Sequence, residues 1–230
     1  MKASAIIVAA GSGVRLGSTE PKAFVKIDGR TMLSYSLVTL RQINSIDELV
    51  IAVPEGFENS ARAEVAAAGV TLPVKITAGG IERQDSVRIA LELTSAESEL
   101  VIVHDAARPL ATPAIFEACL TAASRASAAI AAIPVSDTLK RVTDRTITAT
   151  IARAGLWQAQ TPQAFRRDLI IAAHQRAFRE NILATDDADL VERTGAPVEV
   201  VEASTTNLKI TTQSDLAIVE AIIAAQPSSS

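Results

Sequence analysis

One stretch decides the fold of this chain: Ile6-Ile7-Val8-Ala9-Ala10-Gly11-Ser12-Gly13-Val14-Arg15-Leu16-Gly17, followed by Pro21-Lys22. An apolar run of strand length ends there in a glycine-rich loop with two cations. Glycines let backbone N–H groups approach an anion closely, and Arg15 and Lys22 neutralise charge that backbone dipoles cannot. The spacing matches neither the dinucleotide fingerprint nor the Walker loop. We predict a phosphate-binding loop after a first core strand; the alternative is a plain connection in which glycine only serves a positive φ.

The composition is that of a globular protein. The chain has 230 residues, of which 48% are hydrophobic and 21% charged, enough for one large α/β domain that we expect over residues 1–225. Aromatic residues make up 3% and the net charge is −4, which argues against nucleic acid or an anionic membrane as partner. No apolar run approaches the ~20 residues that span a bilayer. We therefore expect a cytoplasmic enzyme, with residues 226–230 as a disordered tail.

Apolar runs of strand length alternate with helix-period segments over the first 134 residues. Strands are expected at Ala3–Ala9, Leu49–Val53, Val74–Thr77, Leu100–His104 and Ala128–Pro134, and helices at Thr31–Gln42, Phe57–Ala68, Ser86–Leu93 and Pro113–Ala123. This alternation predicts a Rossmann-like α/β fold, a mostly parallel twisted sheet with helices on both faces. Ligands of such sheets bind at the carboxyl ends of the strands. The glycine loop, Gly79-Gly80 and His104-Asp105 all fall at that edge.

The pattern changes after Pro134. The β-branched runs Thr138–Val142 and Thr146–Ile151 predict a hairpin with Asp144 near its tip. Because the hairpin interrupts the main domain, we expect residues 137–152 to project as a β-arm. An arm cannot bury a face alone, so we expect a partner subunit to cover it. Later elements are expected at Arg166–Glu180 (helix), Val198–Val201 (strand) and Gln213–Ala225 (helix).

Asp105 stands at the end of a buried-type strand, in His104-Asp105-Ala106-Ala107-Arg108-Pro109. A carboxylate there can bind Mg²⁺, or another divalent cation, that also touches substrate phosphates. The alternative is an aspartate that caps the following turn. The glycine loop on the same edge favours the metal. We expect His104 to be a packed, hydrogen-bonded histidine and Cys119, the only cysteine, to be a small buried hydrophobe.

A second loop, residues 79–87, joins a predicted strand to a helix. Ser86 can cap that helix or hydrogen-bond a nucleotide base. Gly80 can bring its backbone against a flat base edge, and Arg83 can orient the loop or pair with a carboxylate. Lys209 lies in a strand-like apolar run, where it is either a solvated edge residue or a point charge for phosphate.

Taken together, these segments resemble the 2-C-methyl-D-erythritol 4-phosphate cytidylyltransferase family of isoprenoid precursor biosynthesis. The matching strings are Ala9-Ala10-Gly11-x-Gly13-x-Arg15, Pro21-Lys22, Gly79-Gly80-x-x-Arg83-x-x-Ser86-Val87, His104-Asp105-Ala106-Ala107-Arg108-Pro109, Pro134-x-x-Asp137-Thr138-x-Lys140, Arg153-x-x-Leu156-Trp157, Gln160-Thr161-Pro162-Gln163, Thr185-Asp186-Asp187 and Asn207-x-Lys209. They cover most of the chain in the family's order. Ala23 and Ile81 depart from the pattern, where Gln and a polar residue are usual.

The resemblance implies that the phosphate of methylerythritol phosphate attacks the α-phosphorus of CTP and releases pyrophosphate. It implies catalytic roles for Arg15, Lys22, Arg153 and Lys209. It implies a CTP site of Ala9, Ala10, Gly11, Gly13, Arg15, Lys22, Gly80, Arg83, Ser86 and Asp105. It implies a sugar-phosphate site of Asp105, Arg108, Thr138, Arg153, Thr185 and Lys209, with Asp105 as the metal ligand. The arm, with Thr138 and Arg153, would reach a neighbouring subunit of a homodimer.

Two other functions are considered. A ribitol 5-phosphate cytidylyltransferase shares this fold, but its usual string resembles His-Asp-Ala-Val-Arg-Pro, whereas this chain has Ala107. A non-catalytic nucleotide-binding regulatory module would bind CTP without releasing pyrophosphate. Such a module needs fewer charges than Arg15, Lys22, Asp105 and Lys209 supply.

Overall fold

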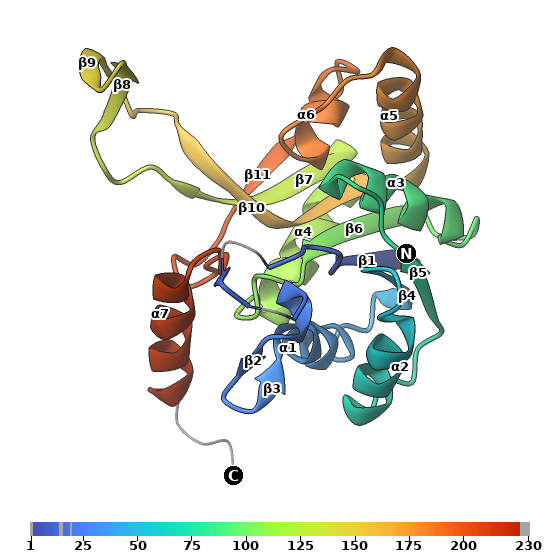
Figure 1. Ribbon diagram of the computed structural model, residues 1–230. Coiled ribbons are helices and arrows are strands. Elements are labelled where there is room, and N and C mark those ends of the chain that lie inside the picture. The colour runs from blue at the N-terminus through green and yellow to red at the C-terminus, as the bar shows by residue number, and fades with distance from the viewer. Residues whose placement is uncertain (1, 14–15, 19, 226–230) are drawn as a thin grey trace.

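A seven-stranded sheet forms the centre of the computed structural model, which describes residues 2–13, 16–18 and 20–225 (Figure 1). Its strands, in spatial order, are β11 (Glu199–Glu202), β7 (Ala128–Pro134), β10 (Trp157–Arg166), β6 (Leu100–Asp105), β1 (Ala3–Val8), β4 (Ile46–Val53) and β5 (Val74–Ala78). The pairs β1–β4, β1–β6, β4–β5 and β11–β7 are parallel, whereas β10 runs antiparallel to both β6 and β7. The mostly parallel sheet is thus confirmed, although the central antiparallel strand β10 was not expected.

Helices cover both faces of this sheet, as predicted. They are α1 (Met32–Leu40), α2 (Glu58–Ala67), α3 (Arg83–Leu93), α4 (Pro113–Ala126), α5 (Arg167–Glu180), α6 (Asp187–Glu192) and α7 (Gln213–Ala224). Successive residues of β1 point to opposite faces. Ile7 joins the cluster made with α1, α2 and α4, whereas Ile6 joins the cluster made with α3, α5 and α6. Both isoleucines are 0% exposed, so β1 is buried on both sides, as parallel strands require.

A smaller third cluster ties the glycine loop to the end of the fold. Leu16 packs with Ile27, Met32, Ile210 and with Val219 of α7, and all five are buried. This region also contains the one-turn helix η2 (Lys22–Phe24) and the short ribbon β2 (Lys26–Ile27) and β3 (Arg30–Thr31). The sequence pattern did not predict these short elements.

The arm is the hairpin of β8 (Leu139–Thr143) and β9 (Thr146–Ile151), which projects from the sheet in Figure 1. Asp144 and Arg145 have φ of 48° and 65° and form the two-residue turn, so the hairpin and its tip are confirmed. The arm leaves from neighbouring strands, because Pro134 of β7 pairs with Trp157 of β10. Val142 and Ile147 are 53% and 60% exposed on it.

Some boundaries and elements differ from the expectation. β4 begins at Ile46 rather than Leu49, and α6 was not predicted. Lys209 lies in an irregular segment and not in a strand. The described helices include none that is both long and apolar enough to cross a membrane. Residues 226–230, expected to be a disordered tail, lie outside the described residues.

The strand order places a crevice at one edge of the sheet. From β1 the chain moves outward through β4 to β5 and then returns to β6 on the other side of β1. Where the order reverses, the loops after β1 and β6 diverge, and ligands of doubly wound sheets bind in the space between them. The glycine loop follows β1, and Asp105 ends β6.

Candidate active site

A cleft of about 430 Å³ opens at this edge of the sheet. Its walls come from the loop after β1, the start of α3, the end of β6 and the segment before α7. The described lining residues are Val8, Ala9, Ala10, Gly11, Ser12, Gly13, Leu16, Lys22, Ala23, Gly80, Ile81, Glu82, Arg83, Ser86, Asp105, Ala106, Ala107, Lys209 and Thr211. This size is that of an ordinary small-molecule site.

The glycine loop folds back on itself and brings Lys22 to the cleft. The Lys22 N–H donates to the Gly11 carbonyl at 3.1 Å, and the Leu16 N–H donates to the Gly13 carbonyl at 2.8 Å. Gly13 has φ of +75°, and a Cβ there would lie 3.1 Å from the backbone nitrogen of Lys22. Glycine is therefore needed at 13 for both the left-handed conformation and the close approach. Arg15, predicted to act here, lies outside the described residues.

The second loop packs tightly against the first. A Cβ on Gly79 would lie 2.4 Å from the Ala10 Cβ, so a side chain at 79 would push the two loops apart. Ser86 is 1% exposed; its hydroxyl accepts the Gly80 N–H at 3.1 Å and donates to the Glu82 carbonyl at 3.2 Å. Ser86 does not cap α3, because Glu82 is the N-cap residue. The helix-cap alternative for Ser86 was therefore wrong, and its hydroxyl holds the loop that lines the cleft.

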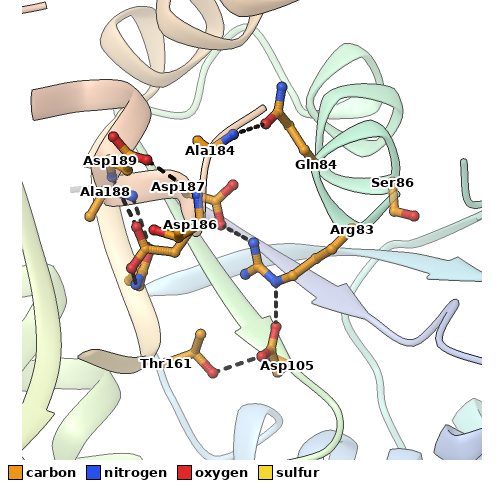
Figure 2. Close-up of polar contacts among 12 residues, drawn as sticks. Arg83, Gln84, Ser86, Asp105, Thr161, Ala184, Asp186, Asp187, Ala188 and Asp189 are labelled. Atoms are coloured by element: carbon orange, nitrogen blue, oxygen red, sulfur yellow. Dashed lines mark hydrogen bonds and ion pairs between the residues drawn. The ribbon is translucent and has the colours of Figure 1, made fainter. Parts of the chain in front are cut away.

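Asp105 belongs to an ion-pair network, of which Figure 2 shows the contacts of Arg83 with Asp105 and with Asp187. One carboxylate oxygen of Asp105 accepts the Arg83 Nε–H at 2.8 Å, and the other accepts from Lys209 Nζ at 2.6 Å. Arg83 also donates through Nη1 to Asp187 at 2.8 Å. The Asp105 backbone N–H donates to the Thr161 hydroxyl at 3.0 Å. Arg83 therefore pairs with carboxylates, one of the two roles that the sequence had left open.

The neighbouring charges decide the protonation of these buried groups. Burial opposes ionisation of Asp105, but Arg83 and Lys209 outweigh it and hold the pKa of that carboxyl well below its usual range. Burial likewise opposes ionisation of Asp187, and Arg83 together with His174 lowers its pKa. The pKa of Arg83 is raised, because the two carboxylates outweigh its own burial. All three side chains are charged at neutral pH.

His104 and Cys119 are structural, as expected. The His104 ring is 1% exposed, packs against Phe116 with ring centroids 4.9 Å apart, and has Nδ1 3.2 Å from the Thr161 hydroxyl. Burial lowers the pKa of His104 to about 4. Cys119 is 0% exposed, and burial raises the pKa of its thiol to about 12, so it is no nucleophile.

The structure brings most of the predicted nucleotide site together. The predicted residues that line the cleft are Ala9, Ala10, Gly11, Gly13, Lys22, Gly80, Arg83, Ser86, Asp105 and Lys209. The remaining described ones, predicted for the sugar-phosphate site, lie outside its lining: Arg108, Thr138, Arg153 and Thr185. Three of these are exposed: Thr138 and Arg153 at the base of the arm, and Thr185 just before α6.

Arg108 has a supporting position under the cleft. It is 9% exposed, and its Nη1 donates to the Asn207 carbonyl at 2.8 Å. The Asn207 amide donates to Gln160 Oε1 at 2.7 Å and to the Thr161 carbonyl at 3.0 Å. These bonds connect the loop after β6 to β10 and to the segment that carries Lys209.

The sequence reasoning missed several residues of the site. Ser12 and Thr211 line the cleft, and Asp187 and His174 complete the network behind it. Asp187 was quoted only as part of the resemblance. No local signal marks it, because three acidic residues around a single alanine have the pattern of a solvated turn.

Comparisons of sequence and of structure with known proteins all match the same enzyme family. The sequence model of a family described as 2-C-methyl-D-erythritol 4-phosphate cytidylyltransferase matches residues 3–225. A protein of that name from Syntrophus aciditrophicus is 43% identical over 224 residues, which cover 96% of each chain. The crystal structure of the protein of that name from Thermus thermophilus is 36% identical, with a TM-score of 0.82 over 98% of this chain and 100% of that one. A 4-diphosphocytidyl-2C-methyl-D-erythritol synthase structure from Anaerococcus prevotii is 30% identical, with a TM-score of 0.85 over 96% and 98% of the two chains.

Proposed function

Because this chain belongs to the 2-C-methyl-D-erythritol 4-phosphate cytidylyltransferase family, we propose that it converts CTP and 2-C-methyl-D-erythritol 4-phosphate to 4-diphosphocytidyl-2-C-methyl-D-erythritol and pyrophosphate. A phosphate oxygen of the sugar alcohol forms a bond to the α-phosphorus of CTP while the bond from that phosphorus to the β-phosphate oxygen breaks. The observation that carries the proposal is the cleft itself, in which a glycine loop, two lysines and a buried carboxylate converge.

The residues of the cleft divide the work. The nucleophile is already an anion, so the enzyme needs no strong base; it must bring two anions together and stabilise the charge on the transferring and leaving oxygens. Lys22 and Arg15 stabilise the departing pyrophosphate. Gly80 and Ser86 face the cytosine, because they lie where the loop backbone approaches the cleft wall. Lys209 positions the attacking phosphate.

Asp105 is the residue that would hold Mg²⁺ or another divalent cation. The part of the chain that the structure describes contains no group of three or more His, Cys, Asp or Glu side chains arranged for a metal ion. A single carboxylate such as Asp105 fits a cation that arrives with the triphosphate, since Mg²⁺ usually takes one or two carboxylates plus phosphate oxygens. Lys209, whose side chain is 41% exposed, is the partner that can release Asp105. The bound cation would neutralise charge on the triphosphate.

The arm supports a shared site in a homodimer. β8 and β9 pair only with each other in the described sheets, and a two-stranded ribbon is marginally stable alone. Val142 and Ile147 give this ribbon exposed apolar surface that a second copy of the chain would cover. Thr138 and Arg153, at the base of the arm, would then complete the sugar-phosphate site of the neighbouring subunit. This arrangement would account for two of the predicted residues that lie outside the cleft of their own chain, Thr138 and Arg153.

The test is pyrophosphate release from CTP and Mg²⁺ with 2-C-methyl-D-erythritol 4-phosphate, run in parallel with ribitol 5-phosphate. We expect turnover with the first sugar phosphate. Turnover of ribitol phosphate alone would replace the substrate that we propose. CTP binding without pyrophosphate release from either would favour the non-catalytic module.

A further inference from the structure

A line of four polar contacts runs from the interior of the α5–α6 layer to the cleft. His174 Nε2 lies 3.0 Å from Asp187 Oδ1, and Asp187 Oδ2 accepts from Arg83 at 2.8 Å. Arg83 donates to Asp105 at 2.8 Å, and Asp105 accepts from Lys209 at 2.6 Å. His174 and Asp187 are each 1% exposed and do not line the cleft. In the described part of the chain, their hydrogen bonds reach the cleft through Arg83.

Asp187 is held in place from several sides. It begins α6, whose N-cap Asp186 accepts the Asp189 N–H at 2.9 Å. Gln163 of β10 donates to Asp186 at 2.9 Å and accepts the Ala188 N–H at 3.2 Å, so Asp187 stands between two anchored neighbours. Figure 2 shows this turn beside Arg83. Because Asp187 is a carboxylate that accepts from His174, the ring nitrogen Nε2 must carry the proton.

Arg83 contacts two carboxylates at once, and this limits the number of hydrogen bonds that it makes to Asp105. A guanidinium can bind a carboxylate through two parallel hydrogen bonds and then engages both oxygens. Here Nη1 is committed to Asp187, Nε meets one oxygen of Asp105, and Nη2 is buried with no hydrogen-bond partner among the described residues. The orientation of the guanidinium toward both carboxylates thus leaves Nη2 off the second oxygen of Asp105. The second oxygen of Asp105 is left on the cleft side, where Lys209 contacts it.

We propose that Asp187, fixed by His174, is a positioning residue that draws Arg83 away from a bidentate contact with Asp105 and so keeps one Asp105 oxygen available to the nucleotide and its divalent cation. This inference rests on the proposed function, which gives Asp105 that ligand. Without the charge of Asp187, the guanidinium would turn onto both oxygens of Asp105. Metal-dependent binding of CTP would weaken, whereas contacts of CTP with the glycine loop would remain.

The experiment measures the dissociation constant of CTP by calorimetry, with Mg²⁺ and with EDTA, on wild type, Asp187→Asn, Arg83→Lys and His174→Leu. Supporting residues around a metal ligand typically change affinity by about 10- to 100-fold. We expect Asp187→Asn to weaken CTP binding on the order of tenfold in Mg²⁺ and by much less in EDTA. Arg83→Lys should weaken binding in the same way, since a single ammonium replaces the two fixed donor nitrogens, Nε and Nη1, that meet the two carboxylates. His174→Gln, whose amide can still donate to Asp187, should restore what His174→Leu loses.

Two measurements separate positioning from a structural effect. A variant that is only less stable lowers the melting temperature and the folded fraction, but its folded molecules keep the wild-type Mg²⁺ dependence of CTP binding. Glu180→Gln is the matched control, because Glu180 lies on α5, the helix that carries His174, but pairs with Arg176 at the surface. If Asp187→Asn does not fold, the Mg²⁺ dependence of CTP binding is compared in Arg83→Lys and the two His174 variants instead. An unchanged Mg²⁺ dependence in the folded variants would overturn the inference, whereas a wild type that binds no CTP would overturn the proposed function.

Discussion

His104 should make the stability of this protein fall as the pH is lowered below neutrality. Burial lowers its pKa from 6.5 to about 4 in the folded chain, and the unfolded chain keeps the ordinary value. Between these two pKa values the unfolded state binds a proton that the folded state does not. A fall in pH therefore favours the unfolded state. The contribution of neutral His104 to stability is fully present above the pKa of the unfolded state and is lost as the pH falls towards the pKa of the folded state.

The size of the effect follows from the two pKa values. At about 1.4 kcal/mol per pH unit, the interval from 6.5 to about 4 corresponds to about 3 kcal/mol in total. About 2 kcal/mol of this should be lost between about pH 7.5 and about pH 5, a window in which most carboxylates stay ionised in both states. That is a large share of the stability of an ordinary domain.

The assay is urea unfolding of wild type and His104→Gln across this window. Glutamine removes the titrating group, and the lost ring contact with Phe116 should make the variant less stable at neutral pH. Its stability should nevertheless depend less on pH, so the two curves converge as the pH falls. The only other histidine, His174, is present in both proteins and its contribution cancels. Parallel curves for the two proteins, or a His104 resonance that titrates near pH 6.5 in the folded protein, would refute the reasoning.

Three further predictions concern the cleft and the arm. Lys22→Ala should lower kcat by on the order of 10²-fold or more, because it removes charge stabilisation from the transition state; steady-state kinetics that show a change in KM alone would contradict this. Gly13→Ala should cost about 1–2 kcal/mol in backbone strain and also displace Lys22, since its Cβ would lie 3.1 Å from the Lys22 nitrogen. Gly17→Ala is its control, because φ there is +68° with no described atom within 4 Å of the added Cβ, so only Gly13→Ala should lower kcat beyond the loss of stability. Replacing Val142 and Ile147 with lysine should weaken the proposed dimer at least about tenfold in sedimentation, with activity lost in parallel; a fully active monomer would exclude the proposed shared site.

Local pattern was enough to predict the elements around the first half of the site. Ile6 and Ile7 are apolar on both faces, and a strand of that kind must be covered by helices on both sides. The glycine loop follows directly, so its position at the edge of the sheet needs no distant partner. The same holds for Asp105, which ends a strand that begins with four apolar residues.

Tertiary partners decided what the sequence did not predict. β10 carries Gln160, Thr161 and Gln163 inside the fold at 5%, 4% and 1% exposure, which no apolar pattern indicates. Their polar groups are satisfied by residues far along the chain, as with Gln163 and Asp186. Asp187 has the sequence context of a solvated acidic run, because its partner Arg83 is 104 residues away. Lys209 was expected in a strand, but it lies in an irregular segment, from which its side chain contacts the Asp105 carboxylate.

The contact between Leu16 and α7 sets an order of events during synthesis. Leu16 belongs to the loop after β1, whereas its partners belong to α7, the last helix of the described fold: Val219 packs on Leu16, and the Gln213 amide donates to its carbonyl. The sheet and its two helical layers can form while translation continues, since domains begin to fold from the N-terminal side. The glycine loop must wait, because its apolar cover is translated about 200 residues later. A nascent chain that stops before α7 would contain a nearly complete sheet whose glycine loop does not yet have its apolar cover.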